Sequence, residues 1–291
     1  MDLPKDFYKK VESPEYLKSV IYGDTDSIFL VIPTPDKDLA AENKISLSNK
    51  IGKDINKDIT DYLNNIYFKR ANIDPKYNYT NFKTEFIMDS IIFLPEVKKQ
   101  YAFKVIIQDE KILKETKVIY KGIQVVRIDA SKLGQRLLKN MIEEIILNTN
   151  IKKDDKLNYI TKAVNDTYNE FLECINSLNV IDIGISCKWG KDNSIINSMK
   201  LYNFIMDENT FLAASAGRFV YCDFKDMKKF KDLNIDTTKL NAIAIPYTYN
   251  PEKVKEKLSE FGISLNEKLQ WNRVFTTTCQ RVVDLVKGFS K

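Results

Sequence analysis

The sequence predicts an α+β protein, in which an antiparallel sheet with packed helices is followed by a mainly helical domain. Short apolar runs of β-formers alternate with polar turns in the first part, whereas apolar residues recur every three or four positions from Ser131 onward. The 291 residues, 44% of them hydrophobic, suit one large or two ordinary domains with a real core. We therefore expect two domains, over residues 1–130 and 131–291.

The first part begins with a tight hairpin. Two runs of apolar β-formers, Val20-Ile21-Tyr22 and Ile28-Phe29-Leu30-Val31-Ile32, are separated by a Gly-Asp break. A helix is expected from about Leu47 to Tyr67, because isoleucine and leucine recur there at the spacing that is typical of core packing. Strands are then expected over Thr84–Leu94, Val97–Ile107 and Thr116–Val126, with a charged hairpin tip at Asp109-Glu110-Lys111.

The second part is dominated by helical patterns. Leucine, isoleucine and methionine trace one helix over residues 133–146, and a second is expected from about Leu157 to Leu178. A mixed region with strand-like pieces covers Ile183 to Tyr249. Two amphipathic segments follow, Pro251–Phe261 and roughly Leu269–Val286.

Composition restricts the chemistry. The net charge of +5 permits a polyanionic partner without requiring one. The four cysteines lie far apart with no C-x-x-C pair, so we expect reduced thiols and no zinc or iron–sulfur site. Histidine is absent, and any catalysis must therefore use carboxylates and lysines. The reduced thiols favour a cytoplasmic protein. No signal peptide or apolar run of membrane-spanning length is present.

Two aspartates, Asp24 and Asp26, fall on the tip of the expected hairpin. A tip of this kind can direct both carboxylates to one point, and Mg²⁺ prefers a few rigidly placed carboxylate oxygens, with water and substrate phosphate filling its other positions. Such a site suits two-metal phosphoryl transfer, so Asp24 and Asp26 are the candidate catalytic and metal-binding residues. The alternative is that Asp-Thr-Asp makes only a solvated turn.

The hexapeptide Tyr22-Gly23-Asp24-Thr25-Asp26-Ser27 resembles the palm-domain metal motif of family B DNA polymerases. The resemblance implies that Asp26 bridges two Mg²⁺ ions and that Asp24 is more peripheral. Tyr22 and Thr25, from the same motif, are secondary site candidates. It also implies that residues 1–130 are the C-terminal part of a polymerase palm and that residues 131–291 are the thumb.

A second motif follows in the order that the family shows. Lys98-Lys99-Gln100-Tyr101 resembles the K-K-x-Y motif at the family's palm–thumb junction, which contacts the primer–template. Adjacent lysines and an aromatic on a strand would place cations near phosphates and the Tyr101 ring beside the minor groove. An exposed strand edge is the alternative for the two lysines.

A third segment, from Lys121 to Asp129, resembles the K-G-x-x-x-x-R-x-D sequence by which the family's palm enters its thumb. Lys121 and Arg127 are candidate phosphate or sugar contacts. Asp129 either orients Arg127 or closes a strand end by a salt bridge. Glu85 matches an acidic palm position of the family, and it lies either near the metals or in solvent.

Several family motifs do not occur in these 291 residues. We find no D-x-x-S-L-Y-P-S segment, which supplies the other metal aspartate, and no K-x-x-x-N-S-x-Y-G helix, which binds the incoming nucleotide. We therefore expect the palm and thumb part of a DNA-directed DNA polymerase, inactive until an N-terminal polymerase segment or subunit adds the remaining carboxylate for the Mg²⁺ ions. The other expected partners are primer–template DNA and dNTP, with a sliding clamp as a further candidate and no membrane.

Three further hypotheses concern the origin and the function of the protein. The split and the compact thumb favour a viral or phage origin, and hence the host cytoplasm. A non-catalytic DNA-binding accessory subunit that retains a polymerase-like fold is the main alternative function. An RNA-templated polymerase is disfavoured, because such enzymes carry adjacent aspartates, whereas Thr25 separates Asp24 from Asp26.

Overall fold

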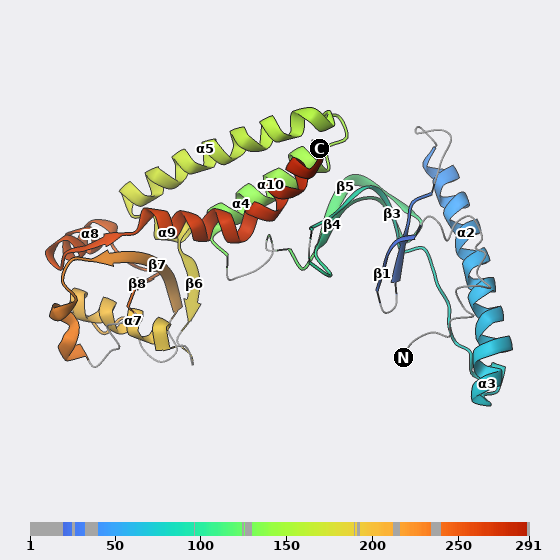
Figure 1. Cartoon of the computed structure of the whole chain (residues 1–291), viewed down its shortest axis with the longest axis horizontal. Helices are drawn as coiled ribbons and strands as arrows, with labels where there is room; N and C mark the ends of the chain where they lie inside the picture. Colours follow the sequence, from blue (N-terminus) through green and yellow to red (C-terminus); the bar gives the residue numbers. More distant parts are fainter. Residues whose placement is uncertain are drawn as a thin grey trace. The chain divides into compact units, whose positions relative to one another are not determined.

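The computed structural model of the chain (Figure 1) describes residues 20–24, 27–32, 40–95, 97–123, 125, 130–188, 190, 193–211, 216–233 and 240–289. Its contacts divide the chain into two compact units. The first comprises residues 1–89 and 105–117, and the second comprises residues 90–104 and 118–291. This division passes through a three-stranded sheet, and the domain boundary expected near residue 130 stays a prediction.

The first unit contains the hairpin that the sequence predicts. β1 (Val20–Asp24) pairs antiparallel with β2 (Ser27–Leu30), and the register places Asp24 opposite Ser27. The two strands are therefore joined by only two residues. The rings of Tyr22 and Phe29, which pair across the strands, stack with their centroids 5.5 Å apart, as cross-strand aromatic pairs commonly do.

The long helix of the first unit is also confirmed, with an earlier start. α2 (Ala41–Tyr62) continues through a π-helical turn, η2 (Leu63–Phe68), into α3 (Lys69–Ala71), and the short 3₁₀ turn η3 (Pro75–Tyr77) follows. Asn72 ends the helix in the left-handed conformation. The Asn56 side chain accepts a hydrogen bond from the Phe82 amide and donates one to its carbonyl, which fastens the following loop to the helix.

A three-stranded sheet has the order β3 (Phe86–Phe93), β4 (Tyr101–Gln108) and β5 (Lys111–Lys121). Asp109 and Glu110 form the two-residue turn between β4 and β5, with φ angles of 46° and 62°. Two positive φ angles match the twist of a hairpin, and this confirms the charged tip. The strand expected from Val97 begins instead at Tyr101, because residues 97–100 form the turn that leads into β4.

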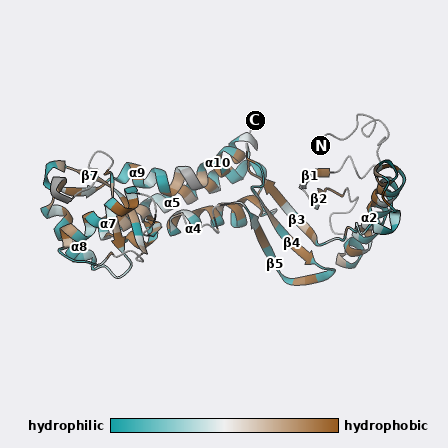
Figure 2. Cartoon of the chain, turned by 90° about the horizontal axis from the view of Figure 1, so that it is seen from below, coloured by the Kyte–Doolittle hydropathy of each residue, from teal (hydrophilic) through white to brown (hydrophobic). Residues whose placement is uncertain are grey.

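Helices form one half of the second unit, and most of them are those predicted. The Ser131 hydroxyl caps the first of them by accepting a hydrogen bond from the Gly134 amide at 3.1 Å. The helices α4, α5 and α10 pack against one another in Figure 1, and each carries hydrophobic and hydrophilic residues together (Figure 2). The helical elements of this half are α4 (Lys132–Asn140), η5 (Met141–Ile146), η6 (Lys153–Asp155), α5 (Lys156–Ser177), α6 (Val180–Ile183), α9 (Glu267–Trp271), η9 (Asn272–Thr276) and α10 (Thr277–Phe289).

An antiparallel sheet forms the other half of the second unit. β7 (Ala216–Phe224) pairs with β6 (Ile185–Lys188), β8 (Ala242–Pro246) and β9 (Ile263–Leu265). The helices of this half are α7 (Asn193–Met206), the 3₁₀ helix η7 (Met227–Leu233) and α8 (Pro251–Glu260). Antiparallel sheets beside several helices confirm the α+β class. The sequence predicts strand-like pieces between residues 183 and 249 but does not predict α7.

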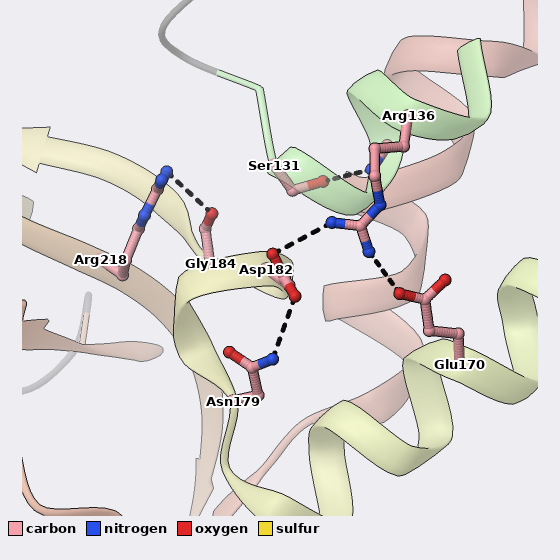
Figure 3. Close-up of polar contacts among 8 residues, drawn as sticks. Ser131, Arg136, Glu170, Asn179, Asp182, Gly184 and Arg218 are labelled. Carbon is pink, nitrogen blue, oxygen red and sulfur yellow. Dashed lines mark hydrogen bonds and ion pairs between the residues drawn. The ribbon is translucent and has the colours of Figure 1, made fainter. Parts of the chain in front are cut away.

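Polar contacts connect the helices of the second unit to one another and to its sheet (Figure 3). Arg136 on α4 pairs with Glu170 on α5 and with Asp182 on α6, the latter at 3.2 Å, and Asn179 donates to Asp182 at 3.0 Å. The buried Gln270 side chain accepts from the Tyr221 amide on β7 and donates to the Ile183 carbonyl. These bonds fix α6 and α9 against the sheet.

Lys156 closes the end of η5. Its ammonium donates to the carbonyls of Ile145, Ile146 and Asn148 at 2.9, 2.6 and 3.0 Å. A cation is favourable at the C-terminal end of a helix, although burial lowers the pKa of this lysine. Among the described helices, none combines the length and the apolar character needed to cross a lipid bilayer.

Candidate polymerase active site and nucleic-acid interface

The hairpin β1–β2 carries the aspartate motif. Asp24 is the last residue of β1 and Ser27 the first of β2. The structure describes the backbone of Asp24. Thr25 lies outside the described residues, and so does Asp26, which is expected to bridge the two metal ions. The placement of the two carboxylates at one point therefore stays a prediction from the sequence.

The chemistry of the motif fits Mg²⁺ in part. Carboxylate oxygens are the hard ligands that this ion takes from proteins, and two of them are a usual protein share when substrate phosphates supply others. Among the described residues, no group of three or more acidic, histidine or cysteine side chains is placed to hold a metal ion. Glu85 precedes β3 with an exposed side chain, and its carbonyl accepts a hydrogen bond from the Asp109 amide at 2.9 Å. Its role stays a prediction.

The hairpin exposes apolar side chains on its strands and directly after β2. Ile21 and Val31 are 44% and 51% exposed, and Val20 and Ile28 are also exposed. Within the described part of the chain β1 and β2 form a sheet of two strands, with no third strand hydrogen-bonded to either. Such a pair is marginally stable in water, and its open edges favour pairing with a further strand.

The turn between β3 and β4 presents Lys98 and Lys99. The Leu94 amide donates to the Gln100 carbonyl at 2.9 Å and closes the turn, in which Lys99 has a φ of 60°. Both lysine side chains are exposed. They therefore project from a closed turn rather than from a strand edge, so the strand placement expected from the sequence is wrong for these two residues.

Tyr101 lies directly after this turn and points into the unit. Its ring is 7% exposed, and it packs against Phe93 and Phe103 with centroid distances of 5.8 and 6.1 Å. The aromatic residue of the motif thus anchors the first residue of β4. Its expected contact with the minor groove stays a prediction.

Gly122 brings the third motif onto the same turn. Its φ is +64°, and a Cβ atom there would lie 2.4 Å from the Lys99 carbonyl oxygen. Only glycine combines this conformation with so close an approach. Lys121, the preceding residue, ends β5 with an exposed side chain. Lys98, Lys99 and Lys121 therefore belong to one small surface region, whereas Arg127 and Asp129 lie outside the described residues.

A fourth cation, which the sequence motifs do not predict, lies beside the turn between β3 and β4. Arg281 on α10 donates from Nη1 to the Gln100 Oε1 atom at 3.3 Å, and its side chain is exposed. The amphipathic pattern predicted the helix, but only the packing of α10 onto the sheet reveals which of its polar residues meets the turn. We call Lys98, Lys99, Lys121 and Arg281 the basic turn cluster.

Comparisons with known proteins agree with the motifs. The model of DNA polymerase family B matches residues 2–250. The DNA polymerase of Choristoneura biennis entomopoxvirus is 28% identical over 174 residues, which are 58% of this chain and 16% of that polymerase. The chain thus matches well under two thirds of its viral relative. Because the family model covers most of the chain, the protein belongs to DNA polymerase family B.

Proposed function

We propose that the chain forms the catalytic hairpin and the thumb of a DNA-directed DNA polymerase, which adds dNTPs to a primer 3′-hydroxyl. The observation that carries this proposal is the antiparallel hairpin in which β1 ends at Asp24 and β2 begins at Ser27, in a chain of this family, with Thr25 and Asp26 between the two strands in the sequence. The viral relative supports a viral origin. A location in the host cytoplasm stays a prediction.

In this proposal Asp24 and Asp26 hold two Mg²⁺ ions. When bound, the ions would activate the primer hydroxyl and neutralise charge on the triphosphate. The role of the chain's own residues is positional: the hairpin would fix the two carboxylates, and Lys98, Lys99 and Lys121 would hold the primer–template through its phosphates. Two carboxylates alone make an incomplete cage, so a segment with the D-x-x-S-L-Y-P-S aspartate is required for activity.

The exposed apolar residues of the hairpin support this requirement. A strand from the completing segment would pair with an edge of β1 or β2 and cover Val20, Ile21 and Val31. An obligate assembly of this kind would bury more than about 2,000 Å². A sliding clamp remains a candidate partner.

The test is primer extension by the assembled enzyme with single carboxylate replacements. Asp26→Asn should reduce extension by on the order of a thousandfold or more, because one carboxylate serves both ions, while primer–template binding should hardly change. Asp24→Asn should cost less. Calorimetric titration with Mg²⁺ in the presence of dNTP should show weaker metal binding by the Asp26 variant. Near-normal extension by that variant would reject the catalytic assignment and favour the accessory-subunit alternative.

A further inference from the structure

The C-terminal helix α10 brings a cation to the turn of the K-K-x-Y motif. Cys279, Val282 and Val286 on this helix are fully buried, in the same core as Leu94, Ala102 and Ile123. These contacts hold α10 beside the ends of β3, β4 and β5. Arg281 lies on the neighbouring exposed side of the helix, where it meets Gln100.

The geometry around Arg281 is set from several directions. The Leu94–Gln100 hydrogen bond closes the turn, and Gly122 packs directly on the Lys99 backbone. Gln100 accepts the Arg281 hydrogen bond through its side chain, and a guanidinium has four other N–H donors left for a ligand. Asp284, an acidic neighbour on α10, accepts a hydrogen bond from Gln280 at 2.9 Å. Among the described residues, no carboxylate pairs with Lys98, Lys121 or Arg281.

We propose that Arg281 is a further phosphate contact for the primer–template, held in place by Gln100 and acting together with Lys98, Lys99 and Lys121. This rests on the proposed polymerase function. Four exposed cations from the β3–β4 turn, the end of β5 and α10 suit a polyanion that passes over all three elements, and arginine binds phosphate in a planar, two-pronged geometry. The last helix of the chain thereby takes part in DNA binding.

The experiment measures primer–template affinity of the full chain against salt concentration. Arg281→Gln should weaken binding about threefold to tenfold at low salt and lower the log–log salt slope by about one unit, because one phosphate contact is lost. Lys287→Gln makes the same change of charge on the same helix, six residues further on, and should leave both quantities as they are. Arg281→Lys keeps the charge and should retain the slope.

Gln100 serves as the test of positioning. Gln100→Ala should weaken binding when Arg281 is present and add nothing to Arg281→Gln, so the two effects should not be additive. Circular dichroism and thermal unfolding check that each variant is folded. If Arg281→Gln leaves affinity and slope unchanged while Lys98→Ala with Lys99→Ala lowers both, this inference is overturned and the proposed function stands. If neither replacement has an effect, the proposed DNA interface fails as well.

Discussion

Replacing Gly122 by alanine should damage the turn that carries Lys98 and Lys99. The new Cβ atom would lie 2.4 Å from the Lys99 carbonyl oxygen and 3.2 Å from the Gln100 side chain. An alanine at a φ of +64° costs about 1–2 kcal/mol by itself, and the backbone of a closed turn must move as well. We expect a total destabilisation of about 2–3 kcal/mol, within the range of strained single substitutions.

The assay is urea unfolding followed by circular dichroism, with primer–template binding measured in parallel. The midpoint should fall with an unchanged m-value, and DNA affinity should fall because the lysines are displaced. Gly288→Ala is the matched control: nothing lies within 4 Å of its Cβ position in α10, so alanine should be neutral or stabilise by about 0.5–1 kcal/mol. Wild-type stability and affinity of the Gly122 variant would refute the close packing of the two motifs.

Three other predictions follow from the packing. Lys156→Met should lower the free energy of unfolding by about 2–4 kcal/mol in a urea titration, because three carbonyls lose their charged donor. Lys162→Met, on the exposed side of the same helix, is the control and should have little effect. Burial raises the pKa of the Cys187 thiol to about 11. Its alkylation by iodoacetamide should therefore be slow at pH 8, speed up as the pH rises, and become fast in urea. Rapid alkylation of Cys187 in the folded chain at pH 8 would contradict this burial. Ile21→Lys should reduce self-association of the chain in sedimentation and weaken its binding to the completing segment, since Ile21 is exposed on an open strand pair. If self-association and binding are both unchanged, the exposed apolar residues of the hairpin have no role in assembly.

Much of the fold was predictable because local signals agreed with the final packing. Apolar spacing predicts α5 and α8 nearly to their ends and α2 with a start six residues too late, and the Gly-Asp break predicts the β1–β2 hairpin. Asn250, with Pro251 after it, caps α8 through a hydrogen bond to the Lys253 amide. In these places the residues that determine the local structure all lie within one short stretch of sequence.

The differences arise where distant contacts decide the local structure. α7 packs into the core beside the sheet through Met199, Tyr202 and Ile205, whereas the sequence predicts only strand-like pieces over this stretch. Lys98 and Lys99 read as strand residues, but the bond between Leu94 and Gln100 and the contact with Gly122 make them a turn. Arg281 is 181 residues from Gln100 in sequence, and nothing local marks their meeting. For the aspartate motif the structure describes the strands, while the carboxylates of Asp24 and Asp26 remain sequence-based predictions.

The central claim is that this chain supplies one part of a polymerase active site. It is tested most directly by primer extension with the full chain alone and mixed with a polypeptide that carries the D-x-x-S-L-Y-P-S segment. We predict no extension by the chain alone and Mg²⁺-dependent extension by the mixture, lost again with Asp26→Asn. Robust extension by the single chain, or by the mixture that contains the Asp26 variant, would contradict the account.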